Sequence, residues 1–405
     1  MKIVICYIIQ WTIQVQTLIF INLSKMQTIQ YLDDFQNLKD LLYISSFAET
    51  TNILALKLFN IMEKKSILSP TSISYLVSLF HILSDGIVHT QISDVIGEEN
   101  SIKNLTEIYN NCNNNKYIND SSIIKIINCI IINNKIKLND QFLFQFDKIV
   151  TIMSKNFSNP IFTADECNYF INQQTNYLIQ NMVKPELITA DASLILINVL
   201  YFKTIWRTSF NKELTKYKLF NMTQSIPIMK QQALVNYYEN SNVQIIDLPF
   251  VYGKFSMKFV LPKYYIGLIE CGRYLFKDIS KQQQYVDYEI PKFTQRSKID
   301  LVPLLKKIGI TNLFNERNGN LSKISHQPIF VSKAIHEAVV IVDEEGTPAF
   351  STTETRSGCE SCINTLVLSS ESESKYIKCY FNRSFVYSIF DTTNNNILYI
   401  GTFEG

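Results

Sequence analysis

The side chains that could carry chemistry are few in this sequence and widely separated. Cys359 and Cys362 form a C-x-x-C pair, a spacing that occurs in redox pairs and in one half of some zinc sites. No second such pair accompanies it, so chance spacing within a loop is the favoured interpretation. The four histidines do not stand at metal-ligand spacings and are interpreted as structural or surface residues: His81, His89, His326 and His336.

The known sequence signatures of enzymes are absent from the chain. It contains no G-x-S-x-G motif, no phosphate-binding P-loop, no G-x-G-x-x-G motif and no H-E-x-x-H motif. A Cys–His pair assembled only in the fold would leave no such mark. An unrelated hydrolase is therefore the weakest of the functional hypotheses, and we expect no metal site and no cofactor.

The composition is that of a large globular chain. Of 405 residues, 46% are hydrophobic and 12% aromatic, which is enough to bury a sizeable core and excludes a disordered chain. The formal net charge is +2, without a strong basic block, so nucleic acid is not expected as a main partner. The eight cysteines are too few and too scattered for a disulfide framework, and we expect most of them to be buried.

Residues 1–46 are interpreted as a leader or extension. Lys2 precedes the apolar run 3–9, which has the shape of a signal peptide. Glutamines at positions 10, 14 and 16 interrupt this pattern, no A-x-A site follows, and Met26 offers a second start. An extracellular location is slightly favoured, with a cytoplasmic location as the alternative.

Apolar spacing predicts helices early in the chain and strands later. Residues 50–62 and 166–183 show helical periodicity, and Ser69 offers a cap for a helix that begins at Pro70. The long apolar run 193–203 is typical of a central strand. Further strands are expected at 243–249, 255–261, 285–290, 338–343, 376–381 and 385–400. Such segregation favours an α+β fold.

The segment 331–355 is the most informative stretch. A strand-like run ends at Val342, three acids follow, and Gly346 predicts a bend. Small residues then alternate at Thr347, Ala349, Ser351 and Thr353. In an extended chain they share one face, which suits a strand that must enter a crowded sheet. From these residues alone, a polar surface loop is an equally weighted alternative.

At this point the sequence resembles the serpin family. AVVIVDEEGTPA at 338–349 is similar to the serpin hinge, and FNRSFVYSIFDTTNNNILYIGTF at 381–403 is similar to the C-terminal serpin signature. INVLYFKTIWRTSF at 197–210 is similar to a third serpin block. Shorter matches keep the family's order across about residues 47–405: 67–74, 226–231, 245–250, 256–262, 289–293 and 304–314.

The resemblance implies a serpin domain at 47–405. Its fold would be α+β, with a large central mixed β-sheet, two smaller sheets, eight to nine helices and an exposed reactive-centre loop at about 344–380. Its function would be that of a monomeric suicide-substrate inhibitor of a serine or cysteine protease, which traps the covalent acyl-enzyme by inserting the cleaved loop into the central sheet. The Asn-rich composition is similar to that of serpins from large DNA viruses, including poxviruses.

The resemblance also assigns residues. The hinge consists of Glu344, Glu345, Gly346, Thr347, Pro348 and Ala349. Positions that control opening of the central sheet match Ser69, Ser72, Asn198 and His336, which we expect to form a buried hydrogen-bond network. Trp206 matches a tryptophan that packs where the hinge enters the sheet.

The reactive bond is less well defined. Counting forward from the hinge by the usual family spacing places it at Glu360–Ser361, whereas counting back from the C-terminal signature reaches Glu373. We place the extra residues after the bond, in about 364–375, because insertion requires a defined length on the hinge side. Two alternatives remain: Cys359, and the trypsin-like bond Arg356–Ser357.

Several residues depart from the family pattern. Pro348 replaces an acid and would remove a hydrogen-bond donor from an inserted strand. Phe350 is large for its position, and Ser384 replaces a proline. Pro348, Phe350 and the unusual loop length favour the second hypothesis, a non-inhibitory serpin that acts as a binding or carrier protein. The region that holds a basic helix in polyanion-activated serpins, about 100–120, has only Lys103 and Lys116, so no strong heparin site is expected.

Overall fold

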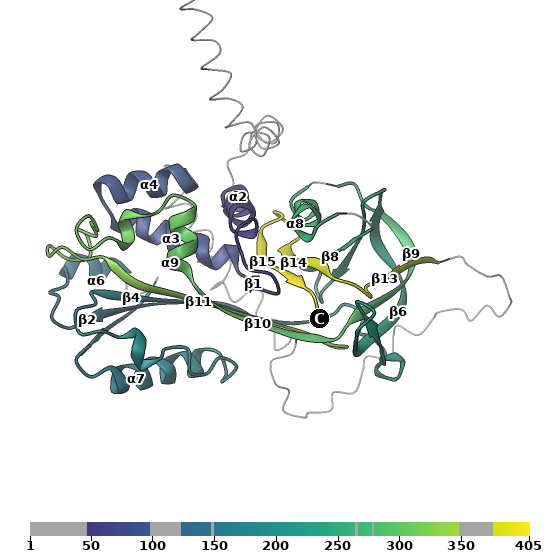
Figure 1. The fold of residues 1–405 in the computed structure, drawn as a ribbon, viewed down its shortest axis with the longest axis horizontal. Helices are drawn as coiled ribbons and strands as arrows, with labels where there is room; N and C mark the ends of the chain where they lie inside the picture. The colour runs from purple at the N-terminus through teal and green to yellow at the C-terminus, as the bar shows by residue number, and fades with distance from the viewer. Residues whose placement is uncertain (1–46, 98–122, 147–149, 264–265, 278, 348–375) are drawn as a thin grey trace, which may run out of the picture. The chain divides into compact units, whose positions relative to one another are not determined.

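The computed structural model describes residues 47–97, 123–146, 150–263, 266–277, 279–347 and 376–405 (Figure 1). Within this part of the chain, two β-sheets and a set of helices enclose three clusters of buried hydrophobic residues. The predicted α+β class and its large mixed sheet are confirmed. None of the described helices combines the length and the apolar character needed to span a membrane.

The central sheet determines the geometry of the site. Its order is β10 (Phe293–Asp300), β11 (Val331–Val342), β4 (Leu194–Ile205), β2 (Ile123–Asn133) and β3 (Thr151–Lys155), and the short β12 (Gly346–Thr347) also pairs with β4. β11 and β4 run parallel, as do β2 and β3, and the remaining pairs are antiparallel. β4 is apolar along nearly its whole length because both faces of the sheet are covered.

The second sheet joins the two smaller sheets of the expected fold through one long strand. β6 (Gln224–Glu239) pairs with β5 (Lys216–Phe220) and β9 (Gln282–Pro291), and its last residues pair with β7 (Val243–Pro249). β13 (Ile377–Tyr380) lies beside β9. Beyond β7 follow β8 (Phe255–Pro262), β14 (Phe385–Asp391), β15 (Ile397–Phe403) and β1 (Ile67–Leu68).

Helices cover both faces of the central sheet (Figure 1). One face packs against α2 (Phe47–Phe59), α3 (Pro70–Leu83), α4 (Gly86–Ile96), α6 (Asp140–Phe146) and α9 (Leu301–Lys307). The other packs against α7 (Pro160–Gln174). Short helical segments complete the described part: α8 (Leu268–Gly272), η2 (Pro185–Leu187), η3 (Lys212–Leu214), η4 (Arg273–Leu275) and η5 (Asn312–Phe314).

Local signals explain where two of these helices begin. Ser69 caps α3 by accepting a hydrogen bond from the Ser72 backbone N–H, as the sequence predicts. The predicted bounds of the helix at 166–183 are wrong. Asn159 caps α7 before Pro160, and the helix ends at Gln174, since the next residues include positive φ angles at 176 and 177. The described cysteines are buried thiols, as expected: Cys129, Cys167, Cys271 and Cys379.

Candidate functional site

The hinge is a tight reversal at the end of β11. The Asp343 carboxylate accepts hydrogen bonds from the backbone N–H groups of Glu345 (2.9 Å) and Gly346 (3.0 Å), and the Asp343 N–H donates to the Gly346 carbonyl (3.1 Å). Gly346 has φ +143°, and a Cβ atom here would lie 2.5 Å from the Ile205 Cα. Only glycine therefore allows the chain to turn back this close to β4.

The reversal carries the chain into the central sheet beside β4. β11 and β4 pair from Val331 opposite Leu194 to Ala338 opposite Leu200. Beyond those pairs, β12 lies against both strands and runs antiparallel to β4, with Gly346 opposite Ile205. Thr347 is paired with Thr204 through the backbone. The sheet is thus open at one end, and two residues of an additional strand are already in place.

A buried carboxylate fixes the start of the hinge. Glu344 is 4% exposed, and its carboxylate accepts hydrogen bonds from Lys292 Nζ (2.7 Å) and Thr215 Oγ1 (2.8 Å). Burial alone would raise the pKa of Glu344, but the hydrogen bonds from Lys292, its own backbone and Thr215 outweigh it, so its pKa is lowered. The neighbouring pair Lys212–Glu345 is exposed and contributes little.

Trp206 holds the hinge backbone from the β4 side. Its backbone N–H donates to the Glu345 carbonyl and its indole Nε1–H donates to the Asp343 carbonyl, both at 2.8 Å. The indole stacks on Phe250, with ring centroids 4.5 Å apart. The residue therefore packs at the hinge, where the sequence places it.

The four residues predicted to form a polar network do lie together beneath the opening. His336 Nδ1 is 2.7 Å from Asn198 Oδ1, across the β11–β4 pair. Ser72 Oγ donates to the same oxygen (2.9 Å), and the Asn198 amide donates to the Ser72 carbonyl (2.9 Å). The Ser69 N–H donates to His336 Nε2 (3.0 Å). Sequence reasoning missed a fifth member, Asn128 on β2, whose Oδ1 accepts from the Asn198 amide (2.7 Å).

The network holds His336 as a neutral imidazole. Nε2 accepts the Ser69 N–H, so the proton is on Nδ1 and is donated to Asn198. Complete burial lowers the pKa of His336 to about 3. The only signal for Asn128 in the sequence is a polar residue inside the apolar run of β2.

We expect acid to destabilise the protein through His336. Its folded-state pKa of about 3 lies below the ordinary value of 6.5, so below about pH 6.5 the unfolded chain binds a proton that the folded protein rejects. Stability is then lost as pH falls from about 6.5 towards 3, at up to about 1.4 kcal/mol per pH unit for one proton. Urea unfolding at pH 7, 6, 5 and 4 should show a shallower loss in His336→Gln. His81 and the carboxylates are present in both proteins, so they do not account for a difference between them. If stability falls equally steeply with pH in both proteins, the pH dependence does not come from His336.

A second buried charge lies under the segment that follows α7. Glu337 on β11 is fully buried and pairs with Arg296 on β10. Burial raises the pKa of Glu337, and Arg296 opposes that shift. The Arg296 guanidinium also donates to the Gln180 carbonyl (3.3 Å). The pair therefore connects the edge of the central sheet to the chain that covers it, a link that the sequence gave no reason to expect.

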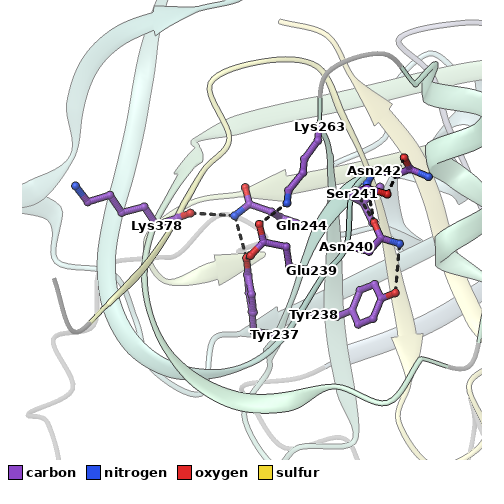
Figure 2. A network of polar contacts seen from close by, with 10 residues as sticks. Tyr237, Tyr238, Glu239, Asn240, Ser241, Asn242, Gln244, Lys263 and Lys378 are labelled. Carbon is purple, nitrogen blue, oxygen red and sulfur yellow. Dashed lines mark hydrogen bonds and ion pairs between the residues drawn. The ribbon is translucent and has the colours of Figure 1, made fainter.

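A polar cluster on the second sheet holds β13, the first strand after residue 375 (Figure 2). The Gln244 amide donates to the Lys378 carbonyl of β13 (3.0 Å) and to the Tyr237 hydroxyl (2.9 Å). Tyr237 donates in turn to Glu239 (2.6 Å), which is paired with Lys263. β13 is thus held along one edge by β9 and at Lys378 by this cluster.

The proposed reactive bonds lie outside the described residues. This applies to Arg356, Ser357, Cys359, Glu360 and Ser361, to Pro348 and Ala349 of the hinge, and to Cys362. Within the described ranges, no group of three or more His, Cys, Asp or Glu side chains could hold a metal ion.

In the described part of the chain, the segment after β11 turns back and pairs with β4 of the central sheet. The family model Serpin (serine protease inhibitor) matches residues 49–404. The chain therefore belongs to the serpin family, whose members are mostly protease inhibitors rather than enzymes.

Known proteins support this assignment. The chain is 29% identical over 339 residues to a serpin-like protein of Acanthamoeba polyphaga mimivirus, covering 80% of this chain and 82% of that protein. It is 28% identical over 311 residues to human neuroserpin, covering 71% and 75%. The thermophilic serpin tengpin in its native state has the same fold, with a TM-score of 0.76, 20% identity and coverage of 90% and 95%.

Removing the Glu344 carboxylate should destabilise the protein. Glu344→Ala would leave Lys292 and Thr215 without their buried acceptor, at a cost of about 2 kcal/mol. The matched control is Lys212→Ala, which removes the exposed ion pair of the same turn and should cost less than about 0.5 kcal/mol. Urea unfolding midpoints measure both changes. Equal shifts of the midpoint in the two variants would show that burial of the Glu344 carboxylate does not contribute to stability.

Proposed function

We propose that this serpin is a suicide-substrate inhibitor of a serine or cysteine endopeptidase. The observation that carries the proposal is β12: Gly346 and Thr347 of the hinge already pair with β4, at the end where β11 and β4 part. The remainder of the hinge needs only to continue in the same direction. Further pairing would extend an existing strand and would not have to nucleate a new one.

The chemistry begins with the protease. Its serine hydroxyl or cysteine thiol attacks the carbonyl carbon of Glu360 in our preferred register, the bond to the Ser361 nitrogen breaks, and that nitrogen leaves with a proton. Cleavage frees the hinge side of the loop to insert between β4 and β11 with the protease still attached as an ester or thioester. Water competes by hydrolysing that acyl bond, so the outcome depends on the rate of insertion.

The buried network lies in the path of the inserting strand. His336 and Asn198 face one another across the β11–β4 pair, and their contact must break when the two strands separate. The groups left behind then need other partners, because unsatisfied polar groups in a core are costly. We infer that this network sets the barrier to opening of the sheet.

The non-inhibitory alternative rests on the sequence of the hinge. Pro348 follows Thr347 directly and has no backbone N–H to give to β4 or β11. An inserted strand would therefore lack one hydrogen bond near its start. A protein with this defect could be cleaved without trapping its protease.

Two measurements on the full chain separate these functions. The protein would be mixed with a panel that includes acid-preferring, trypsin-like and cysteine proteases, and then analysed on denaturing gels. An inhibitor gives a band at the summed mass, and cleavage in the loop raises its melting temperature because the inserted strand stabilises the sheet. Cleavage without a complex and with an unchanged melting temperature would support the non-inhibitory function.

Limited proteolysis tests whether the loop is displayed. We expect the first cuts between about Thr353 and Lys375, a polar stretch outside the described residues that includes the serine-acid run 369–374. Mass spectrometry of the fragments locates the cuts. First cuts within 50–340 would contradict a displayed loop. An extracellular location, a monomeric state and the lack of a strong heparin site belong to the same proposal.

A further inference from the structure

β5 forms an open edge of the second sheet. Among the described strands it pairs with β6 alone, from Lys216 opposite Ile228 to Phe220 opposite Gln224. On its other side, alternate backbone N–H and C=O groups point away from the sheet. A strand edge of this kind can accept one more extended segment.

The side chains of β5 are exposed from Lys216 to Leu219. Apolar side chains lie in the open, with Tyr217 74% exposed, Leu219 62% exposed and Met222, in the turn after the strand, 91% exposed. Tyr217 and Leu219 share one face of the sheet, because side chains alternate along a strand. Lys216 and Lys218 occupy the opposite face. One face of the edge therefore presents apolar side chains and the other presents lysines.

The lysine face carries one positive charge, that of Lys216, without an acidic partner among the described residues. Lys218 Nζ is paired with Glu289 at 2.6 Å, but Lys216 forms no ion pair with any described residue. Exposed lysines on an edge strand disfavour pairing with a second copy, since two such strands would bring like charges together. The same lysines favour a strand that carries acidic side chains.

Both ends of β5 are held in place. At its start, Thr215 donates to Glu344 of the hinge (2.8 Å). After its end, the Asn221 amide donates to Ser384 Oγ (3.2 Å) and to the Glu404 carbonyl (3.1 Å), and the Ser384 N–H donates to Asn221 Oδ1 (3.1 Å). A strand fixed at both ends loses little conformational freedom when a partner binds.

We propose that β5 binds an extended segment of a partner protein in which acidic and apolar side chains alternate. The segment would add to the sheet next to β5. Its acidic side chains would lie opposite Lys216 and Lys218, and its apolar side chains opposite Tyr217 and Leu219. This surface lies beside the hinge, and the proposal does not depend on protease inhibition.

The test uses the full chain and a labelled, end-blocked peptide, Glu-Val-Glu-Val-Glu-Val, in a fluorescence anisotropy titration at low salt. We expect saturable binding that weakens as salt is added, and much weaker binding of Lys-Val-Lys-Val-Lys-Val. Lys216→Glu should weaken binding of the acidic peptide about fivefold, because it removes one attraction and adds one repulsion. Lys306→Glu, an exposed lysine on α9, is the matched control and should leave binding unchanged.

A second variant tests the apolar face. Tyr217→Ser combined with Leu219→Ser changes two exposed side chains, so folding should be retained and binding should fall about tenfold. Hydrogen exchange at the amides of 216–219 should slow in the presence of the acidic peptide. The proposal is overturned if that peptide does not bind, or if Lys216→Glu and Lys306→Glu behave alike. Sedimentation showing a dimer that the double variant abolishes, without peptide binding, would assign the edge to a second copy instead.

Discussion

Replacing Thr347 with arginine is expected to convert the proposed inhibitor into a substrate of its target protease. The backbone of Thr347 already pairs with Thr204 of β4, so we expect Thr347 to be the first hinge residue to enter the interior of the sheet as insertion proceeds. Arginine would bring a charge without a partner into that interior, at a cost of several kcal/mol. Insertion would stall while water hydrolyses the acyl-enzyme.

The measurement is the ratio of covalent complex to cleaved protein on a denaturing gel, with a protease that cuts near Glu360. We expect Thr347→Arg to lower this ratio at least tenfold. Glu345→Arg places the same side chain in the same turn at an exposed position, and should change the ratio little. If complex formation survives Thr347→Arg, insertion of the hinge does not trap the protease.

Restoring the family residue at position 348 should act in the opposite direction. Pro348→Glu returns a backbone N–H to the inserting strand, which should speed insertion and raise the fraction of complex. If neither the unmodified protein nor Pro348→Glu gives a stable complex with any protease tested, the non-inhibitory function is correct.

Removing the Asn198 side chain should have the largest effect on stability. Its amide oxygen accepts from Ser72 and His336, and its amide nitrogen donates to the Ser72 carbonyl and to Asn128. Asn198→Ala would leave several buried polar groups unsatisfied and open a cavity between β11 and β4. We expect a loss of about 3 kcal/mol in the free energy of unfolding.

Urea unfolding at pH 7 measures this loss. Asn236→Ala on β6 changes an exposed asparagine and should cost less than about 0.5 kcal/mol. The weakened sheet should also insert its own loop without cleavage. A slow loss of the proposed inhibitory activity at 37 °C, together with a change in mobility on native gels, would show this insertion. A loss of less than about 1 kcal/mol in Asn198→Ala would mean that water or neighbouring groups replace the amide.

Much of this protein could be predicted from short stretches of the sequence. The cap at Ser69, the apolar run of β4 and the acid-acid-glycine turn at 344–346 act through neighbours within a few residues, so each predicts its own local structure. The order of the serpin blocks predicts the fold. The predicted bounds of the helix at 166–183 were wrong because the helix begins at a cap, Asn159, that lies outside the apolar pattern used to predict it.

Only the tertiary structure decided how the site is assembled. The Asn198–Ser72 contact spans 126 positions and the Asn198–His336 contact spans 138, and the register of β11 on β4 brings these side chains together. The same holds for Lys292, which reaches Glu344 from the chain that links β9 and β10. Such contacts depend on the register of distant strands, and a local pattern of residues carries no information about that register.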